Sequence, residues 1–244
     1  MERVDFVNDS LRLIQDTEGL TFGTDALLLA GYIMNKAVRG CELGAGSGII
    51  SMLLLARNRL RSAVALEVQA EYADLTRRNA ELNGLSERLI SVNTDLRKYR
   101  GEGEFDVVYT NPPYMKTTSG KENALSKKNL ARHEVMGDIS DFAAAASRLL
   151  RYGGQFFAVY RPDRLCDLIS AMRAARLEPK RITFVHADSD SEPSMVLCEA
   201  RLGGRCGALV TKPFLIYKDK THTAYTDDMN HIMENGSFPS EYKR

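Results

Sequence analysis

The sequence has no tryptophan, only four cysteines and seven prolines, and a formal net charge of just +1. No segment approaches the roughly 18 consecutive apolar residues that a membrane-spanning helix needs. The residues after Met1 lack the basic and then apolar pattern of a signal peptide, so we expect a cytoplasmic protein without a membrane partner. Cys41, Cys166, Cys198 and Cys206 form no C-x-x-C pair and have no histidine neighbours. We therefore expect reduced, mostly buried cysteines and no metal site.

The composition suits one α/β domain with appendages. The chain has 244 residues, of which 44% are hydrophobic and 27% charged, enough for a full core and a hydrated surface. We expect an N-terminal extension over residues 1–35, a core over 36–202, and a C-terminal strand and tail over 203–244. The sequence does not indicate the oligomeric state.

A glycine-rich turn follows the first predicted strand of the core. Residues 38–43 are typical of a strand, residues 44–48 read Gly-Ala-Gly-Ser-Gly, and residues 49–56 are typical of an apolar helix. Glycines in this context let the backbone approach a ligand closely. The spacing is G-x-G-x-G and not the G-x-G-x-x-G of nicotinamide and flavin sites.

Two carboxylates end the next two predicted strands. Residues 63–66 lead into Glu67, and residues 89–94 lead into Asp95. A carboxylate at the position of Glu67 can accept hydrogen bonds from both hydroxyls of a ribose. Either acid alone would more often be a hydrated strand end or a helix cap.

The tetrapeptide Asn111-Pro112-Pro113-Tyr114 follows a fourth apolar run, residues 105–110. Two prolines force the chain to leave the sheet in an extended conformation. The Asn111 side-chain oxygen and the Pro112 carbonyl can each accept one N–H of a planar NH2 group, and Tyr114 offers a ring for stacking. Open α/β sheets bind ligands at this edge.

The remaining pattern alternates helix and strand. We predict helices over 24–35 with Thr24 or Asp25 as N-cap, over 69–82 with Gly84 as the stop, and from Asp138 or Ser140 to about 150. Gly153-Gly154 is predicted to turn the chain into a strand over 155–160. A helix over 165–177 is predicted to end before Pro179, and residues 181–186 and 194–201 are predicted closing strands.

These ordered motifs resemble the class I S-adenosylmethionine-dependent methyltransferases that carry Asn-Pro-Pro-Tyr. The resemblance covers roughly residues 39–201. It implies a Rossmann-like α/β fold: a mostly parallel seven-stranded sheet with helices on both faces and an antiparallel last strand. The segment from Glu42 to Gly48 would surround the methionine part of S-adenosylmethionine, and the resemblance assigns Glu42, Leu43, Gly44, Gly46 and Gly48 to the cofactor.

The same resemblance places the rest of the site. Glu67 with Val68 would bind the ribose, and Asp95 with Leu96 would line the adenine pocket. Asn111 would touch the cofactor and, with Pro112 and Tyr114, hold the methyl acceptor.

Both ends of the chain are similar to the bacterial tRNA adenine methyltransferases that modify the base 3′ of the anticodon in a valine tRNA. The similar segments are 22–30, with Gly-Thr-Asp, and 225–229, with Tyr-Thr-Asp-Asp. In that group Thr24 and Asp25 would lie over the cofactor.

A basic, polar segment follows the acceptor motif. Its cations include Lys116, Lys127, Lys128, Arg132 and His133, and we expect them to contact RNA phosphates. The substrate expected from the resemblance is tRNA or another RNA.

Other functions remain open from the residues. Asn-Pro-Pro-Tyr also occurs in enzymes that methylate a glutamine side chain of release factors, although only about 38 residues precede the glycine turn here, too few for their recognition domain. Amino-group methylation in ribosomal RNA or DNA is another possibility. A further possibility is a non-catalytic scaffold that binds the cofactor.

Overall fold

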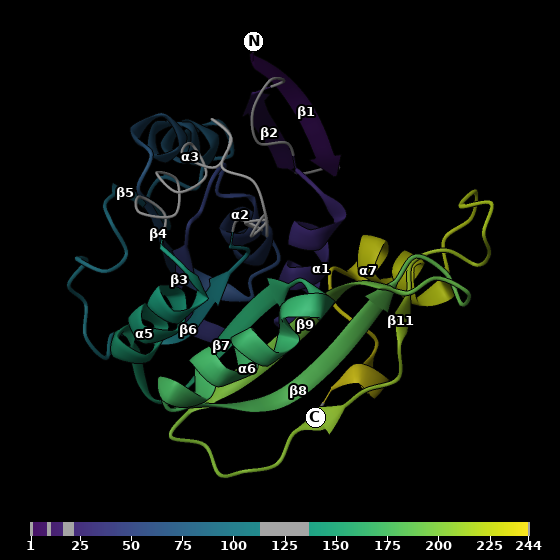
Figure 1. Ribbon diagram of the computed structural model, residues 1–244. Helices are drawn as coiled ribbons and strands as arrows, with labels where there is room; N and C mark the ends of the chain where they lie inside the picture. Colours follow the sequence, from purple (N-terminus) through teal and green to yellow (C-terminus); the bar gives the residue numbers. More distant parts are fainter. Residues whose placement is uncertain (1, 9–10, 17–21, 113–136, 244) are drawn as a thin grey trace, which may run out of the picture.

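The computed structural model describes residues 2–8, 11–16, 22–112 and 137–243 (Figure 1). Its main sheet has nine strands in the order β10-β8-β9-β7-β6-β3-β4-β5, with β11 paired to β8. The strands are β3 (Ala37–Leu43), β4 (Leu60–Glu67), β5 (Leu89–Asn93), β6 (Phe105–Thr110), β7 (Leu150–Tyr160), β8 (Leu177–His186), β9 (Pro193–Leu202), β10 (Leu209–Val210) and β11 (Phe214–Leu215).

Seven of these strands form the predicted sheet. β9 pairs antiparallel with both β7 and β8, while the other core pairs are parallel, so the reversed last strand is confirmed. The two-residue strands β10 and β11 add to the edge beyond β8. Because the sheet is covered on both faces, its central strands β3, β4 and β6 are buried over most of their length.

The helices cover the two faces of the sheet. One core lies between the sheet and α1 (Thr24–Tyr32), α2 (Ile49–Ala56), α3 (Ala70–Leu82) and α7 (Asp227–Asn235). The other lies between the sheet and α5 (Ile139–Leu149) and α6 (Leu165–Ala174). Along β6, Val107 and Tyr109 belong to the first core, and Phe105 and Val108 to the second. Alternation of side chains along a strand explains this division for residues 107–109, whereas Phe105 departs from it at the irregularity in pairing with β7 between Phe105 and Val107.

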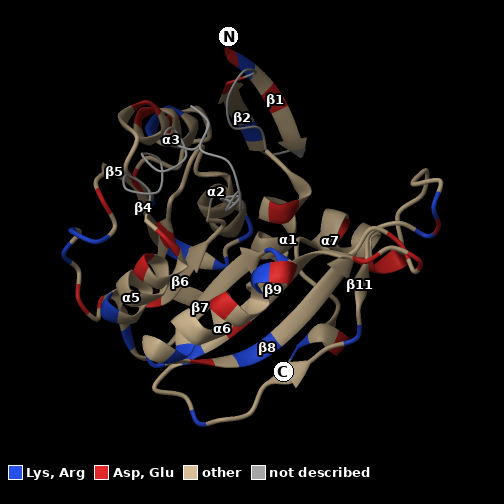
Figure 2. Ribbon diagram, in the orientation of Figure 1, with Lys and Arg blue, Asp and Glu red and all other residues tan. Residues whose placement is uncertain are grey.

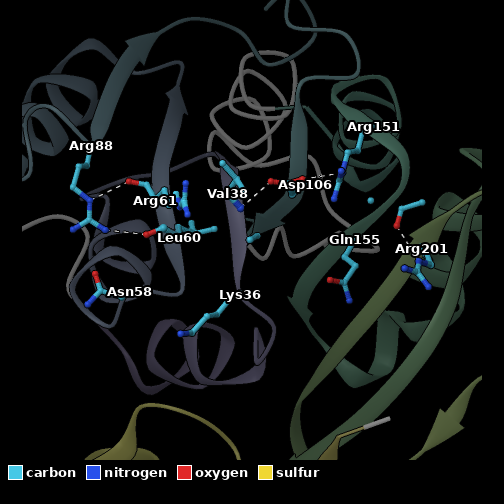
Figure 3. A pocket seen from close by; sticks show the side chains of 13 residues that line it. Lys36, Val38, Asn58, Leu60, Arg61, Arg88, Asp106, Arg151, Gln155 and Arg201 are labelled. Atoms are coloured by element: carbon cyan, nitrogen blue, oxygen red, sulfur yellow. Dashed lines mark hydrogen bonds and ion pairs between the residues drawn. The ribbon is translucent and has the colours of Figure 1, made fainter.

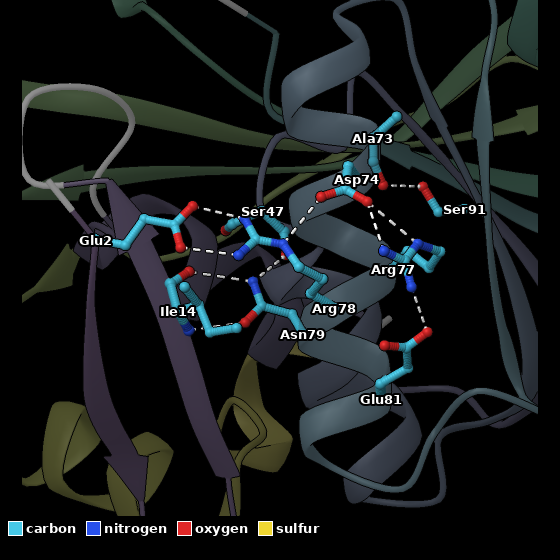
Figure 4. A network of polar contacts seen from close by, with 10 residues as sticks. All are labelled: Glu2, Ile14, Ser47, Ala73, Asp74, Arg77, Arg78, Asn79, Glu81 and Ser91. Carbon is cyan, nitrogen blue, oxygen red and sulfur yellow. Dashed lines mark hydrogen bonds and ion pairs between the residues drawn. The ribbon is translucent and has the colours of Figure 1, made fainter.

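A separate hairpin precedes the core. β1 (Glu2–Asn8) and β2 (Leu11–Asp16) form a two-stranded antiparallel sheet, where the sequence indicated only an extended lead-in. The buried Asn79 of α3 holds this hairpin (Figure 4): its side chain bonds to the N–H and C=O of Ile14 and to the carbonyl of Ser47 in the glycine turn. One α3 side chain therefore fixes the hairpin and the turn together.

The C-terminal segment packs on the first core, which also includes α1. Phe238 lies against Tyr32 of α1, and Tyr242 of the η2 turn (Ser240–Tyr242) packs on Phe238. The η1 turn (Pro162–Arg164) precedes α6. The buried Arg181 guanidinium donates to the carbonyls of Tyr32 and Tyr242 and pairs with Glu199. Within the described ranges, no helix has the length and apolar character needed to cross a membrane.

Three local predictions were wrong. The N-cap of α1 is Gly23 and not Thr24 or Asp25. Gly153-Gly154 lies inside β7, beside an irregularity in its pairing with β6, and Pro179 lies inside β8, next to a register shift. A bulge accommodates glycine and proline in a strand because the ladder is already interrupted there. The structure also forms α7, which we did not predict.

The cysteines are all unpaired, as expected. Cys41 and Cys198 are buried, but Cys166 and Cys206 are exposed, so the expectation of mostly buried cysteines was wrong for half of them. Among the described residues, no group of three or more His, Cys, Asp or Glu side chains could hold a metal ion.

Candidate active site

A cavity of about 160 Å³ lies where β3, β4 and β6 end. β4 and β5 extend the sheet on one side of β3, whereas β6 lies on the other. Open α/β sheets bind ligands at such a switch in strand order. The lining consists of Phe22, Gly23, Asp25, Ala26, Glu42, Gly44, Ala45, Gly46, Ser47, Ile49, Ile50, Glu67, Gln69 and Asn111.

The glycine turn forms the floor of this cavity. Gly44, Gly46 and Gly48 have φ of +67°, +56° and +77°, the left-handed region that other residues rarely adopt. Gly48 is also the N-cap of α2, and a Cβ there would lie 2.7 Å from Cγ2 of Thr76. The Thr76 hydroxyl in turn donates to the Gly46 carbonyl at 2.8 Å. Close packing against α3 therefore fixes the turn.

Glu67 joins two segments of the site. Its carboxylate accepts the N–H of Gly46 at 2.9 Å and the N–H of Gln69 at 2.9 Å. An ionised carboxylate has about four acceptor positions, so two remain after these bonds. The side chain is buried but lines the cavity, so the remaining acceptor positions could serve a ligand with hydroxyl groups.

Glu42 lies near the end of β3, just before the glycine turn. Its carboxyl group accepts the N–H and the hydroxyl of Ser51 at 3.0 and 2.5 Å, and the Ser51 hydroxyl lies 2.7 Å from the Tyr109 hydroxyl. Burial raises the pKa of Glu42 to about 8, the Ser51 hydrogen bonds oppose this rise, and the charge of Glu67 adds to it. Burial therefore favours the protonated form of Glu42, and a cation placed beside it would favour the ionised form.

Asn111 follows β6 and is fixed by α1. Its Nδ2 donates to Oδ2 of Asp25 at 2.7 Å, and the other oxygen of Asp25 accepts the N–H of Ala26 at 2.9 Å. Because an ionised carboxylate can only accept hydrogen bonds, the Asp25 carboxylate must face the NH2 group of the Asn111 amide. The Oδ1 of Asn111 is consequently the end of the amide turned away from Asp25. This contact joins residues 86 positions apart.

Other predicted site residues do not line this cavity. Leu43 is buried in the core, and Thr24 is exposed on α1. Val68 follows Glu67, and its carbonyl accepts a hydrogen bond from Asn93. Leu96 is buried in the second core. The Asp95 carboxylate is bonded to the side chain and N–H of Arg97, whose guanidinium lowers the pKa of Asp95.

Part of the predicted acceptor site lies outside the described residues. Pro112 is described and buried, so its carbonyl remains a predicted acceptor. Tyr114 and the predicted phosphate contacts Lys116, Lys127, Lys128, Arg132 and His133 fall within residues 113–136, which the structure does not describe. Their roles remain predictions.

Sequence reasoning missed four supporting residues, and it placed Asp25 over the cofactor without its contact with Asn111. Ser51 and Tyr109 hold Glu42, Thr76 and Asn79 hold the glycine turn, and Asp25 orients Asn111. Only Asn79 had a visible signal, because an amide on the apolar side of an amphipathic helix needs buried hydrogen-bond partners. The contact between Asp25 and Asn111 depends on tertiary packing and has no local signature.

Comparison with known proteins bears on this site. A family model described as the methyltransferase small domain matches residues 17–169. The chain belongs to the methyltransferase small domain family. This match spans the glycine turn, Glu67, Asp95 and the Asn-Pro-Pro-Tyr motif, and it identifies the protein as a methyltransferase.

Two bacterial relatives of this chain share the same name. A tRNA1(Val) (adenine(37)-N6)-methyltransferase of Phocaeicola vulgatus is 28% identical over 183 residues, covering 75% of this chain and 77% of the relative. The enzyme of the same name from Porphyromonas gingivalis is 28% identical over 189 residues, covering 73% of each chain.

Solved structures share the fold. A protein of Agrobacterium tumefaciens described as a predicted O-methyltransferase aligns with a TM-score of 0.73 at 23% identity, covering 88% of this chain and 98% of that one. TYW2 of P. horikoshii in complex with MeSAdo aligns with a TM-score of 0.60 at 14% identity, covering 83% and 72%. These similarities confirm the Rossmann-like class I methyltransferase architecture.

Proposed function

We propose that this methyltransferase uses S-adenosylmethionine to methylate the exocyclic amino group (N6) of an adenine in tRNA. The observation that carries the proposal is the Asn111 amide, which Asp25 holds at 2.7 Å beside the glycine turn. The names of the relatives support adenine 37 of a valine tRNA as the target. tRNA modification would also place the enzyme in the cytoplasm, as the sequence predicts.

The charge of the cavity fits S-adenosylmethionine. Among its described lining residues, three are acids (Asp25, Glu42 and Glu67) and none is Lys or Arg. Such a lining suits a ligand with a positive sulfonium and an ammonium group, and it disfavours a pyrophosphate. The free acceptor positions of Glu67 suit the two ribose hydroxyls. S-adenosylmethionine would supply a methyl group attached to a positively charged sulfur.

The chain's own contribution is alignment of the acceptor. The lone pair of an adenine amino group is delocalised into the ring, which makes the nitrogen a poor nucleophile. Oδ1 of Asn111 and the Pro112 carbonyl would each accept one N–H. This arrangement favours a pyramidal nitrogen and directs its lone pair at the methyl group. Catalysis then depends on position and electrostatics.

Tyr114 is proposed to stack on the adenine, a contact worth about 1–3 kcal/mol per base in single-strand binding. Its side chain falls outside the described residues. An anticodon-loop base is less costly to extrude than one within a helix, which favours a loop adenine as the target.

The alternative substrates are glutamine side chains of proteins, ribosomal RNA and DNA. The relatives' names favour tRNA over each of them. A non-catalytic scaffold is disfavoured because the Asn111 amide is fixed with an acceptor directed away from its partner, an arrangement that binding of the cofactor alone does not require.

The test is incubation with methyl-labelled S-adenosylmethionine and total tRNA from a strain that lacks the enzyme, followed by nucleoside mass spectrometry. We expect the label in N6-methyladenosine. Label in another nucleoside, or only in a release factor added in parallel, would replace the proposed substrate.

A further inference from the structure

A second cleft lies at the opposite edge of the sheet, where β3, β4, β6 and β7 begin. It has a volume of about 540 Å³. Figure 3 shows the side chains that line it, which come from these strand starts and from the segments before them. Its charged residues are Lys36, Arg61, Arg88, Arg151, Arg201 and a single acid, Asp106.

A neighbouring cleft of about 630 Å³ continues this surface. The two share Gly153, Gln155 and Arg201, and the second adds Lys180, Arg205 and Glu199. Tyr152 also lines it with 79% of its surface exposed. We call the two joined clefts the basic edge. Basic segments along the side of the sheet where strands begin are visible in Figure 2.

The charge of the molecule is concentrated at the basic edge. Its lining contains seven Lys and Arg and two Asp and Glu, a net charge of +5. The whole chain has 33 basic and 32 acidic residues, a net charge of +1. The rest of the chain therefore has 26 basic and 30 acidic residues, a net charge of −4. A polyanion is attracted here and repelled, on average, by the remainder.

Several of these cations are held in place without being neutralised. The Arg88 guanidinium donates to the carbonyls of Arg61, Leu60 and Leu55. Arg201 donates to the carbonyl of Gly153. Bonds to neutral carbonyls leave the full positive charge available to a ligand. Among the described residues, the side chains of Lys36 and Arg61 have no hydrogen bond or ion pair.

Three lysines near the C-terminus, in contrast, are paired with carboxylates. Lys212 pairs with Asp228, Lys218 with Asp227, and Lys220 with Asp190. A phosphate that contacted them would have to compete with these carboxylates. The basic edge therefore has the more available charge.

We propose that the basic edge binds the phosphodiester backbone of the RNA substrate, with Tyr152 available to stack on a base. This inference rests on the proposed function. Arg and Lys are the usual phosphate contacts, and an aromatic ring in a basic groove is typical of RNA-binding surfaces. The seven residues of β3 separate the two edges by about 23 Å. A folded tRNA is longer than that, so one molecule can reach the catalytic cavity and extend along the flank to the basic edge.

The test compares two triple variants with the same change in net charge. The first is Lys36→Gln, Arg61→Gln, Arg205→Gln at the basic edge. The matched control is Arg77→Gln, Lys98→Gln, Arg173→Gln, exposed cations outside both clefts. Binding of fluorescent tRNA is measured by anisotropy over a series of salt concentrations, with S-adenosylmethionine affinity measured by calorimetry on each protein.

We expect the first variant to bind tRNA at least about tenfold more weakly at low salt and its salt slope to fall by about 2–3, since each lost phosphate contact removes about 0.7–0.9. The control variant should have the wild-type tRNA affinity and salt slope. The affinity for S-adenosylmethionine should be unchanged in both triple variants. Equal behaviour of the two variants would overturn the inference. A second outcome would also overturn the inference. In it, the wild type binds adenosine diphosphate saturably, and the first variant loses that binding but retains its binding of tRNA.

These outcomes are distinct from failure of the proposed function. If the wild-type enzyme methylates no RNA, the proposed function fails, whatever the binding measurement gives. If it methylates tRNA and the two variants bind tRNA alike, only the basic edge is refuted.

Discussion

At the scale of single residues, the site depends on a few side chains whose orientation is set by a partner. Asp25 orients Asn111, Ser51 holds Glu42, and Thr76 holds Gly46. Each partner lies on a different element from the residue that it holds, so the fold is needed to assemble them. The chemistry assigned to Asn111 thus requires a particular orientation of its amide, and that orientation can be tested separately from its presence.

Replacement of Asp25 by Asn tests this orientation. The new amide can bond either end of the Asn111 amide, so Oδ1 no longer points reliably to the acceptor. We expect kcat to fall about 10- to 100-fold, roughly 1.4–2.7 kcal/mol, while KM for tRNA changes little. Asp167→Asn, the same change at an exposed position of α6, is the control and should retain full activity. A normal kcat in Asp25→Asn would refute the positioning role.

The pKa of Glu42 predicts a pH-dependent stability. Because burial raises this pKa to about 8, above the ordinary value near 4.5, the folded state keeps a proton that the unfolded chain releases. Stability from this group is full below pH 4.5 and is lost as the pH rises towards 8. The variant Glu42→Gln lacks this dependence.

Urea denaturation at pH 5 and pH 8 measures the effect. The unfolding free energy of the wild type, relative to Glu42→Gln, should fall by a few kcal/mol between these pH values. The exposed Glu87→Gln variant should follow the wild type. A constant difference between the wild type and Glu42→Gln would show that Glu42 is ionised throughout.

At the scale of secondary-structure elements, α3 supports the site from behind. Asn79 joins β2 to the glycine turn (Figure 4), and the Thr76 hydroxyl donates to the Gly46 carbonyl in that turn. Arg78 on the same helix makes only partly exposed ion pairs with Glu2 and Asp74. Buried hydrogen bonds and exposed ion pairs should therefore contribute differently to stability.

We expect Asn79→Ala to lower the unfolding free energy by about 2–4 kcal/mol, because it leaves buried backbone groups without partners. It should also weaken S-adenosylmethionine binding, since the turn loses a support. Arg78→Ala should cost under about 1 kcal/mol and leave cofactor binding intact. Equal costs for the two variants, measured by urea denaturation, would contradict this account of α3.

Alanine variants of two glycines with similar backbone angles can separate the cost of backbone strain from the cost of side-chain crowding. Gly48 and Gly84 both have positive φ, but a Cβ at Gly48 meets Thr76, whereas one at Gly84 meets nothing within 4 Å. Gly84→Ala should cost about 1–2 kcal/mol from backbone strain alone. Gly48→Ala should cost clearly more and weaken S-adenosylmethionine binding about tenfold. Similar stability and cofactor affinity in both variants would show that the packing against Thr76 does not matter.

The sequence predicted those elements whose signals are local. The G-x-G-x-G turn, the strand ends at Glu67 and Asn111, the stop at Gly84 and the helix start at Asp138 are confirmed in place. Pro179 and Gly153 were misassigned, because both act as breakers in isolation but lie at irregular pairs within long strands. The contact of Asp25 with Asn111 could not be predicted, because it depends on how α1 packs over β6.

At the scale of the whole molecule, the two edges of the sheet differ in charge. The carboxyl edge holds an acidic cavity that suits a cationic cofactor, and the amino edge holds a basic surface that suits RNA. A net charge of +1 conceals this separation. Such an arrangement would keep phosphates away from the cofactor site while it increases the attraction of RNA to the protein as a whole.

The most direct test of the central claim is single-turnover methylation of unmodified tRNA by Asn111→Ala, with tRNA binding measured in the same preparation. The lost Oδ1 acts mainly as the amino group becomes pyramidal, so the rate of methyl transfer should fall by at least about 100-fold while the tRNA dissociation constant stays near the wild-type value. A full rate of methyl transfer in Asn111→Ala would contradict the amino-group mechanism and the function assigned to this site.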